Sequence, residues 1–197
     1  MFIKICGLST VRDVEVVAES GADAMGIVLS SSSPRAVSEG RARELVAAGR
    51  DALTTVLVVH DLPVSEAIDH ARRWGVDVLQ LHGYGPADAL LAARELSRTW
   101  RAVPAAAAPA VVGEQGEEAL LLDSHTPGSG EQWDLGTLGA PPRGRWLLAG
   151  GLAPGNVAAA ITAVQPWGVD VSSGVESTRG TKDHALIRRF VAAARGA

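Results

Sequence analysis

Short apolar runs alternate with longer amphipathic runs along the whole chain, and this alternation limits the possible folds more than any other feature. Repeated strand–helix units produce a parallel sheet with right-handed crossover connections. Eight of the short runs have the apolar or β-branched content expected of buried strands: Phe2–Ile5, Ala24–Leu29, Thr54–Val59, Val76–Leu81, Arg101–Val103, Ala119–Leu122, Trp146–Ala149 and Val169–Val171.

The segments between these runs carry signals of helices. Ser9 or Thr10 and Ser38 are placed to cap the first two of them. Two segments depart from the pattern, because Pro104–Gly116 is rich in Ala and Pro and Gly128–Gly144 is rich in Gly. We expect only degenerate helical structure around the fifth and sixth strands. The expected helices are 10–20, Glu39–Ala48, Pro63–Trp74, Pro86–Arg98, Pro154–Thr162 and Thr181–Ala194.

Two arrangements fit such a chain, an open doubly wound sheet and a closed barrel. A count of eight strands favours the (β/α)8 or TIM barrel. At 197 residues the chain is short for this fold, which typically takes about 250 residues. We therefore predict a single domain over residues 1–197, with trimmed loops and no dividing linker.

Composition excludes several classes of function. The net charge is −4 and there is no long run of Lys and Arg, which argues against binding to nucleic acid or to membrane surfaces. One cysteine permits neither an intramolecular disulfide nor a cysteine-based zinc site. The start of the chain has no signal-peptide pattern and no segment has the length of a membrane span. We expect a cytoplasmic protein, either a monomer or a homodimer.

Two reactive side chains stand where strands end, the place where barrel enzymes gather their functional groups. Cys6 closes the first strand ahead of a glycine. It is either a small buried apolar residue or a general base whose pKa neighbouring cations lower. Asp123 closes the all-leucine strand. It is either a structural hydrogen-bond acceptor or a general acid whose pKa burial raises.

Further polar groups follow other strands. Arg35 is either a solvated loop residue or a clamp for a carboxylate, and His82 is either structural or a substrate ligand. Glycine and serine turns after the last two strands match the phosphate site of many barrels. No cluster has metal-ligand spacing and no dinucleotide fingerprint is present, so we predict neither metal nor cofactor. The candidate phosphate ligands are Gly150, Gly151, Ser172, Ser173 and Gly174.

Taken together, these motifs resemble the phosphoribosylanthranilate isomerases. They occur in that family's order and cover nearly the whole chain, although residues 124–134 match only loosely. The motifs are Lys4–Leu8 (KICGL), Ser33–Arg35 (SPR), Leu79–Gly83 (LQLHG), Leu121–Ser124 (LLDS), Ala149–Leu152 (AGGL), Val169–Glu176 (VDVSSGVE) and Gly180–Asp183 (GTKD).

The resemblance implies an enzyme of tryptophan biosynthesis, an intramolecular aldose–ketose isomerase that needs no cofactor. It implies that N-(5-phosphoribosyl)anthranilate, a phosphorylated small molecule, becomes 1-(2-carboxyphenylamino)-1-deoxyribulose 5-phosphate by an Amadori rearrangement. Asp123 would then be the acid that opens the ribose ring, Cys6 the base that removes the C2 proton, and Arg35 the ligand of the anthranilate carboxylate. His82 and Asp170 match family positions that bind substrate.

Alternatives come from two classes. The related isomerase of the histidine pathway, and the bifunctional enzyme of both pathways, would be expected to carry aspartate at the position of Cys6. Ribulose-phosphate epimerases would need a set of metal ligands at the strand ends, which the sequence lacks. A non-catalytic protein that binds a phosphorylated ligand would keep the polar anchors, so the pair Cys6 and Asp123 favours the enzyme over it.

Overall fold

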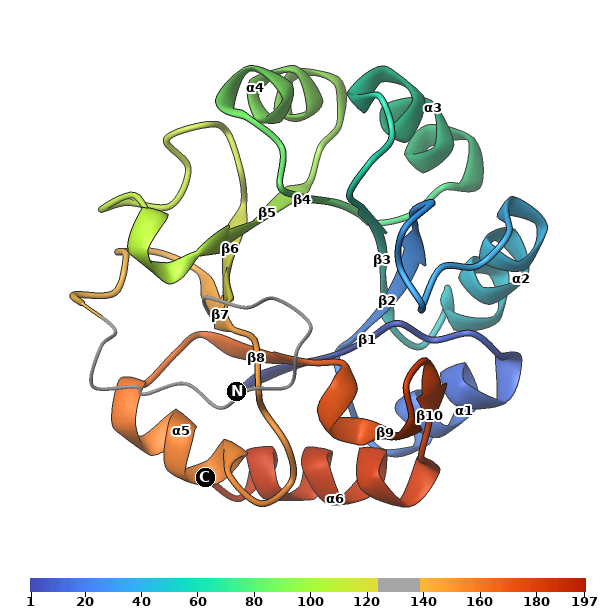
Figure 1. The fold of residues 1–197 in the computed structure, drawn as a ribbon, viewed down its shortest axis with the longest axis vertical. Helices are drawn as coiled ribbons and strands as arrows, with labels where there is room; N and C mark the ends of the chain where they lie inside the picture. The colour runs from blue at the N-terminus through green and yellow to red at the C-terminus, as the bar shows by residue number, and fades with distance from the viewer. Residues whose placement is uncertain (124–138) are drawn as a thin grey trace.

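Eight parallel strands close into a barrel in the computed structural model, which describes residues 1–123 and 139–197. The strands follow each other in chain order, and pairing between the first and the last closes the ring, with Lys4 opposite Asp170. The predicted barrel is confirmed (Figure 1). The strands are β1 (Phe2–Cys6), β2 (Ala24–Leu29), β3 (Thr54–Val59), β4 (Val78–His82), β5 (Thr99–Pro104), β6 (Ala119–Asp123), β7 (Trp146–Leu148) and β8 (Gly168–Val171).

A ring of helices surrounds the barrel and is incomplete on one side. Between α4 and α5 the described residues contain no α-helix, and Figure 1 shows this gap beside β5, β6 and β7. Among the described residues, no helix combines the length and the apolar content that a membrane span requires. The helices are α1 (Val11–Glu19), α2 (Glu39–Gly49), α3 (Val64–Trp74), α4 (Pro86–Glu95), α5 (Val157–Val164) and α6 (His184–Arg195).

The segment after β5 is irregular and lies where a complete barrel would have a helix. It begins with one 3-10 turn, η1 (Ala105–Ala107), and then pairs at Val111 with Arg143. Ala108 and Val112 pack from this segment against the outer core. The prediction that Pro104–Gly116 holds only poor helical structure is confirmed. The second segment expected to be degenerate, Gly128–Gly144, lies mostly outside the described residues.

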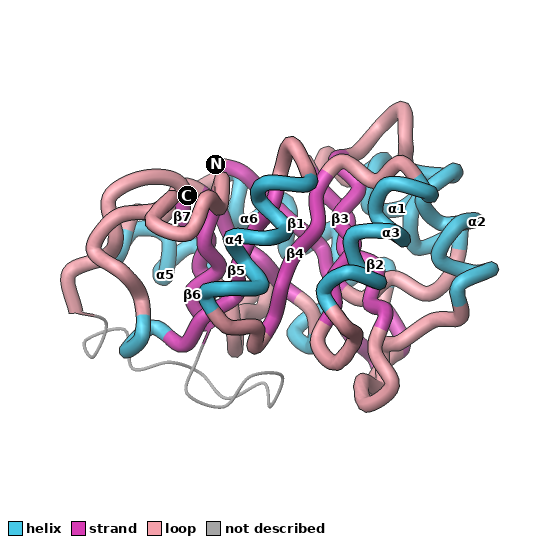
Figure 2. Tube along the Cα trace, turned by 90° about the horizontal axis from the view of Figure 1, so that it is seen from above, coloured by secondary structure: helices cyan, strands magenta, loops and turns pink. Residues whose placement is uncertain are grey.

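Two apolar layers stabilise the barrel. An outer layer lies between strands and helices, and an inner layer fills the ring with side chains such as Val56, Val78 and Leu121. At the N-terminal end of the ring, Phe2 stacks on Trp167 with 4.5 Å between ring centroids, and Trp100 meets both edge-on. The barrel is therefore a packed core whose lower end is closed by three aromatic rings. Figure 2 shows the strands from the side, with the N-terminus at one end of the barrel.

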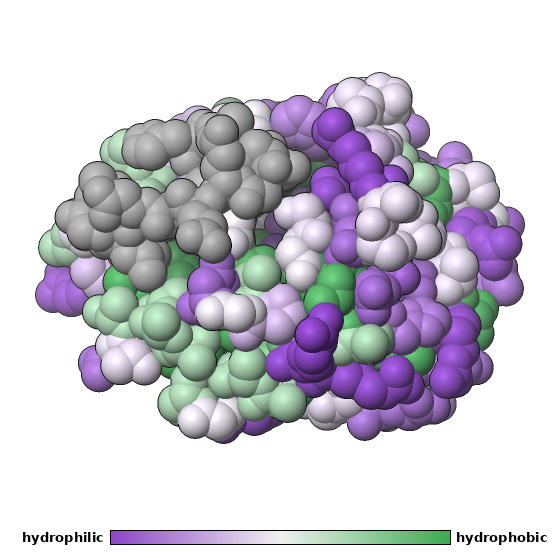
Figure 3. All heavy atoms as spheres, turned by 60° about the horizontal axis from the view of Figure 1, so that its bottom comes forward, coloured by the Kyte–Doolittle hydropathy of each residue, from purple (hydrophilic) through white to green (hydrophobic). Residues whose placement is uncertain are grey.

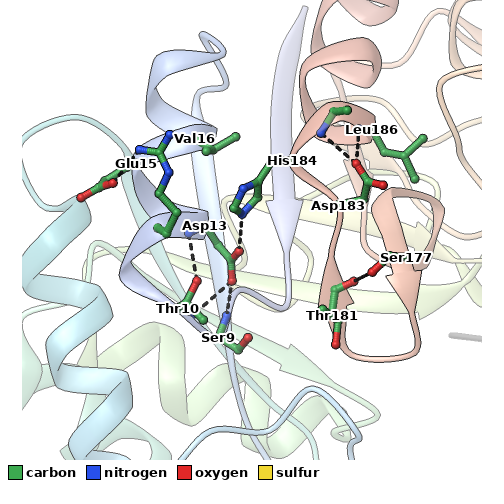
Figure 4. A network of polar contacts seen from close by, with 12 residues as sticks. Ser9, Thr10, Asp13, Glu15, Val16, Ser177, Thr181, Asp183, His184 and Leu186 are labelled. Atoms are coloured by element: carbon green, nitrogen blue, oxygen red, sulfur yellow. Dashed lines mark hydrogen bonds and ion pairs between the residues drawn. The ribbon is translucent and has the colours of Figure 1, made fainter.

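Several boundaries differ from the sequence prediction by one to three residues: α4 ends at Glu95 rather than Arg98, and α5 begins at Val157 rather than Pro154. The start of the last helix differs for a reason that the structure shows. The last helix was expected from Thr181, but it begins at His184, and Thr181–Lys182 forms the strand β10 that pairs with β9 (Glu176–Thr178). The reason is the carboxylate of Asp183, which accepts hydrogen bonds from the N–H groups of Ala185 and Leu186 and so caps the helix (Figure 4). Residues 176–179 of the β9–β10 hairpin therefore precede the helix and line the mouth of the barrel.

The first helix is joined to the last through its own cap. Thr10 caps α1, as predicted, in a reciprocal arrangement in which Asp13 accepts hydrogen bonds from the N–H groups of Ser9 and Thr10. The second oxygen of Asp13 lies 2.9 Å from Nε2 of His184 on α6 (Figure 4). Burial works to raise the pKa of Asp13, but these hydrogen bonds outweigh it and lower that pKa.

The outer surface is uneven in polarity. In Figure 3 the side of α5 is hydrophobic and green, whereas the side of α1 and α2 is hydrophilic and purple. The sequence of α5, VAAAITAV, accounts for the green side, because alanine and β-branched residues occupy its outer face as well as its inner one.

Candidate active site

A cavity of about 980 Å³ opens at the C-terminal ends of the strands. It contains every site residue predicted from sequence except Gly174. It also contains residues that sequence reasoning did not select, among them His60, Gln80 and Glu176. The predicted residues in its wall are Cys6, Arg35, His82, Asp123, Gly150, Gly151, Asp170, Ser172 and Ser173.

Cys6 ends β1 with its side chain turned into the barrel and only 7% exposed. Its neighbour on β2 is Gly26, where an added Cβ would lie 2.7 Å from the sulfur. Glycine at this position makes the room that the thiol occupies. Burial raises the pKa of Cys6 and the charge of Asp170 raises it further, while Lys4 and Lys182 act in the opposite direction.

Lys4 lies two residues before Cys6 on β1 and is fully buried. Its Nζ donates a hydrogen bond of 2.8 Å to Oδ1 of Asp170, the residue opposite it on β8. Burial works to lower the pKa of Lys4, but the charges of Asp170 and Cys6 outweigh this and raise it. The ammonium is therefore charged, and it lies at the inner wall of the barrel beside the thiol.

Asp123 ends β6, where it pairs in register with Pro104. The three leucines before it are buried, while Asp123 itself is partly exposed and lines the cavity. Its side chain therefore belongs to the polar mouth of the barrel, although its strand belongs to the core. The pair of Cys6 and Asp123 faces one cavity from β1 and β6, which are separated by two strands on one side of the ring and four on the other.

Arg35 is held at the mouth by Glu176. Its Nε and Nη2 donate to the two carboxylate oxygens at 2.7 and 3.0 Å, and both side chains are nearly buried. This pair uses one edge of the guanidinium, so the Nη1 edge is directed elsewhere. The pKa of Glu176 is lowered to about 2, because the hydrogen bonds from Arg35, Lys182 and Gly180 outweigh the effect of burial.

Lys182 joins this pair to the end of β1. Its buried Nζ donates to Oε1 of Glu176 at 2.8 Å and to the carbonyl of Ser172 at 2.9 Å. The hydroxyl of Ser172 in turn donates to the carbonyl of Cys6 at 3.0 Å. A continuous polar chain therefore runs from Arg35 to Cys6. Because the Ser172 hydroxyl already donates to Cys6 and accepts from Lys182, the group that Ser172 can offer a ligand is its backbone N–H.

The two glycine-rich turns lie side by side at the mouth. Gly150 and Gly151 follow β7 with φ values of 81° and 63°, which glycine adopts without strain. Asn156 fixes this turn, because its amide accepts from the N–H of Ala153 and donates to the carbonyl of Gly151. From the other turn Gly174 approaches so closely that an added Cβ would lie 1.8 Å from the carbonyl oxygen of Leu152.

His82 ends β4 and has a second histidine beside it. His60 follows β3, its ring lies 5.5 Å from the His82 ring, and its Nδ1 lies 2.9 Å from the His82 carbonyl. Burial is the main cause that lowers the pKa of His82, with the charge of His60 as the next. A neutral imidazole therefore faces the cavity at neutral pH, able to donate or accept a hydrogen bond.

The site combines an acid–base pair with two anion-binding elements. Cys6 and Asp123 can exchange protons with a molecule in the cavity, Arg35 can bind a carboxylate, and the two turns can surround a phosphate. Within the described ranges, no three His, Cys, Asp or Glu side chains lie together in a way that could hold a metal ion. Sequence reasoning missed Lys4, Glu176 and Lys182, although each stands in a quoted motif, because their importance depends on partners distant in sequence.

Comparison with known proteins identifies the relatives of the chain. Residues 3–193 match the sequence model of the family described as N-(5'phosphoribosyl)anthranilate (PRA) isomerase. An N-(5'-phosphoribosyl)anthranilate isomerase of Haloferax volcanii is 41% identical over 212 aligned positions, covering 99% of this chain and 93% of the relative. One from Citrifermentans bemidjiense is 38% identical and covers 98% and 96%.

Solved structures agree with this match. TrpF from Jonesia denitrificans superimposes with a TM-score of 0.93 at 48% identity, covering 100% of this chain and 97% of that one. A phosphoribosyl anthranilate isomerase in complex with reduced 1-(o-carboxyphenylamino)-1-deoxyribulose 5-phosphate superimposes with a TM-score of 0.82 at 30% identity, covering 100% of both chains.

Proposed function

The chain belongs to the phosphoribosylanthranilate isomerase family and catalyses that isomerisation in tryptophan biosynthesis, and we propose that Cys6 is the base and Asp123 the acid of its reaction. The observation that supports these roles best is that one cavity contains both side chains together with Arg35 and the two glycine-rich turns. A thiol and a carboxyl group, placed between two anion-binding elements, fit a substrate with a carboxylate at one end and a phosphate at the other.

The phosphate of the substrate binds in our proposal at the turns that contain Gly150, Gly151 and Ser173. Their backbone N–H groups are the donors. Gly174 lies against the backbone of Leu152 and so keeps the two turns close together. The anthranilate carboxylate binds the edge of Arg35 that Glu176 does not use. The relative solved with a reduced form of the product supports a phosphorylated, carboxylated ligand for this chain as well.

The first step of the proposed mechanism is opening of the ribose ring. Asp123 gives its proton to the furanose oxygen as the C1–O bond breaks, and the lone pair of the anthranilate nitrogen forms the C1=N bond. The product of this step is a protonated Schiff base, and Asp123 is left as a carboxylate. The substrate's own nitrogen accepts the electrons in the next step, so the chemistry uses no cofactor.

The second step is removal of the C2 proton by the Cys6 thiolate. The electron pair of the C2–H bond forms C1=C2, and the C1=N pair returns to nitrogen, which yields an enolamine and a neutral thiol. Tautomerisation moves the hydroxyl proton of C2 away and adds a proton at C1, which gives the ketone. The cationic Schiff base lies next to the thiol just before this step, and a nearby positive charge lowers a thiol pKa.

His82 and Asp170 complete the proposed substrate site. The neutral His82 lies in the cavity wall and can hydrogen-bond a ribose hydroxyl. Asp170 is 9% exposed, and one of its oxygens accepts from Lys4, so its second oxygen can reach a ligand. These two positions bind the part of the substrate between the carboxylate and the phosphate.

The activity is tested by mixing the pure protein with phosphoribosylanthranilate and following the loss of its fluorescence. Turnover without added metal or cofactor is the expected result, and tight product binding without turnover would indicate the non-catalytic alternative. The aminoaldose of the histidine pathway is the control substrate, and its turnover would contradict a single-substrate enzyme. Sedimentation distinguishes a monomer from a homodimer; a dimeric relative from Thermotoga maritima supports the second.

A further inference from the structure

We propose that Lys4 is a positioning residue for the reaction, because its buried ammonium, held by Asp170, stabilises the thiolate form of Cys6. This inference rests on the proposed role of Cys6 as the base. It extends that role to a residue in the inner wall of the barrel, which also holds packed apolar side chains such as Val56, Val78 and Leu121. Lys4 acts through the thiol and has no contact with substrate in this proposal, since its side chain has no exposed surface.

The register of the strands places the three groups together. Side chains two residues apart on a strand face the same way, so Lys4 and Cys6 both turn into the barrel. Asp170 is opposite Lys4 on the neighbouring strand, and the distance from Nζ to Oδ1 is 2.8 Å. The lysine therefore occupies the layer directly beneath the thiol, with its charge fixed on the side of β8.

Stability alone does not account for this pair. Replacing a buried ion pair with apolar side chains of similar volume is often neutral or stabilising. The inner wall already holds the apolar side chains of Val56, Val78 and Leu121, so an apolar side chain can pack at the position of Lys4. An ammonium beside a thiol has an effect that no apolar residue can supply, because it favours the charged form of sulfur.

Other charges also act on Cys6, and Lys4 has the largest effect among the cations. Lys182 on β10 lowers the pKa of Cys6 less, and it is shared between Glu176 and the Ser172 carbonyl. The charge of Asp170 raises the pKa of Cys6. Arg35 also interacts with the thiolate, whose charge raises the pKa of the guanidinium. Lys4 is also the only one of these cations that lies on the same strand as the thiol, two residues before it.

The chain permits a direct test, because Cys6 is its only cysteine. The rate of alkylation by iodoacetamide, measured against pH on the whole protein, therefore reports the titration of this thiol alone. In Lys4→Met, which keeps length and removes charge, we expect the midpoint of that titration to move alkaline by about 1 to 3 pH units. Lys4→Arg keeps the charge, so its midpoint is expected to lie close to that of the wild type.

A second variant guards against failure to fold. Lys4→Met with Asp170→Asn removes both charges and leaves no buried carboxylate without a partner. Lys4 affects the pKa of Cys6 more strongly than Asp170 does. The alkylation midpoint of the double variant should therefore lie above that of the wild type and below that of Lys4→Met. An unchanged midpoint in Lys4→Met, or a midpoint at or below the wild type in the double variant, would overturn the proposal.

Turnover separates this proposal from the one on which it rests. For Lys4→Met we expect kcat to fall by about tenfold or more at neutral pH and to recover at higher pH, with KM little changed. If Lys4 only held β1 to β8, Lys4→Met would lower thermal stability but would not move the acid limb of the pH profile of kcat. If Cys6→Ser keeps normal turnover, the base assignment fails, yet the alkylation midpoint of Lys4→Met still decides the effect of Lys4 on the thiol.

Discussion

Arg35 and Glu176 form a two-bond ion pair at the mouth of the barrel although 141 positions separate them in the sequence. The pair joins the loop after β2 to the first residue of β9, and Lys182 anchors its carboxylate from a third side. A planar guanidinium held on two nitrogens has a fixed orientation. Arg35 is thus presented to the cavity in one direction before any ligand binds.

The first prediction concerns that orientation. In Glu176→Gln the guanidinium loses a charged partner, and we expect KM for phosphoribosylanthranilate to rise by about ten- to hundredfold, since a hydrogen bond to a charged group contributes about 1.5–3 kcal/mol. Steady-state kinetics measures this change. The control is Glu44→Gln, which breaks the exposed pair between Arg41 and Glu44 on α2 and should leave KM unchanged. A lower KM in Glu176→Gln would mean that its charge only repels the anionic substrate.

The second prediction concerns stability and pH. The pKa of Glu176 falls from an ordinary value of 4.5 to about 2 on folding. A carboxylate with a depressed pKa stabilises the folded state fully above its unfolded pKa, and this contribution is lost as pH falls toward the folded value. Wild type should therefore lose more stability than Glu176→Gln between pH 5 and pH 2, as urea unfolding at several pH values would show. Parallel losses in both proteins would contradict the assignment.

The third prediction concerns the acid–base pair. Cys6→Ser and Asp123→Asn should each fold and each lose about 10²–10⁴-fold in kcat, the range typical of general acid–base groups. Thermal unfolding confirms that the variants are native, and stopped-flow fluorescence measures the chemical step. A variant that retains near-normal kcat removes its residue from the proposed mechanism.

The fourth prediction concerns the phosphate turns. In Gly174→Ala a Cβ would lie 1.8 Å from the carbonyl oxygen of Leu152, so the two turns must separate and the proposed phosphate site must widen. We expect weaker binding of phosphorylated product, measured by calorimetry. Gly155→Ala is the matched control, because no atom lies within 4 Å of the Cβ it would add in the neighbouring loop. Equal affinity in both variants would place the phosphate elsewhere.

The sequence predicted the barrel and most of its cavity for a simple topological reason. Parallel strands that follow one another around a ring bring all their C-terminal ends to one mouth. A residue such as Cys6, His82 or Asp123 therefore lies at the mouth once its strand is recognised. The substrate chemistry came from the resemblance of whole motifs, since a cysteine and an aspartate alone do not specify a reaction.

The remaining features depend on contacts between distant segments. Lys4 stands inside a strand, and only the register with β8 shows that it pairs with Asp170. Helical propensity after Gly180 does not reveal that the chain first turns back as β10, because the cap at Asp183 and the pairing with β9 decide that boundary. The hydrogen bond from the Ser172 hydroxyl to the Cys6 carbonyl likewise joins segments that are far apart in the sequence.

The aromatic rings of Phe2, Trp100 and Trp167 close the N-terminal end of the barrel, and this has a kinetic consequence. Within residues 1–123 and 139–197 this end offers a ligand no passage, so substrate and product use the opening at the C-terminal ends of the strands. The product therefore has to vacate the site before the next substrate is admitted, and it should act as a competitive inhibitor. Its escape rate sets an upper limit on the speed of the catalytic cycle, however fast the proton transfers become.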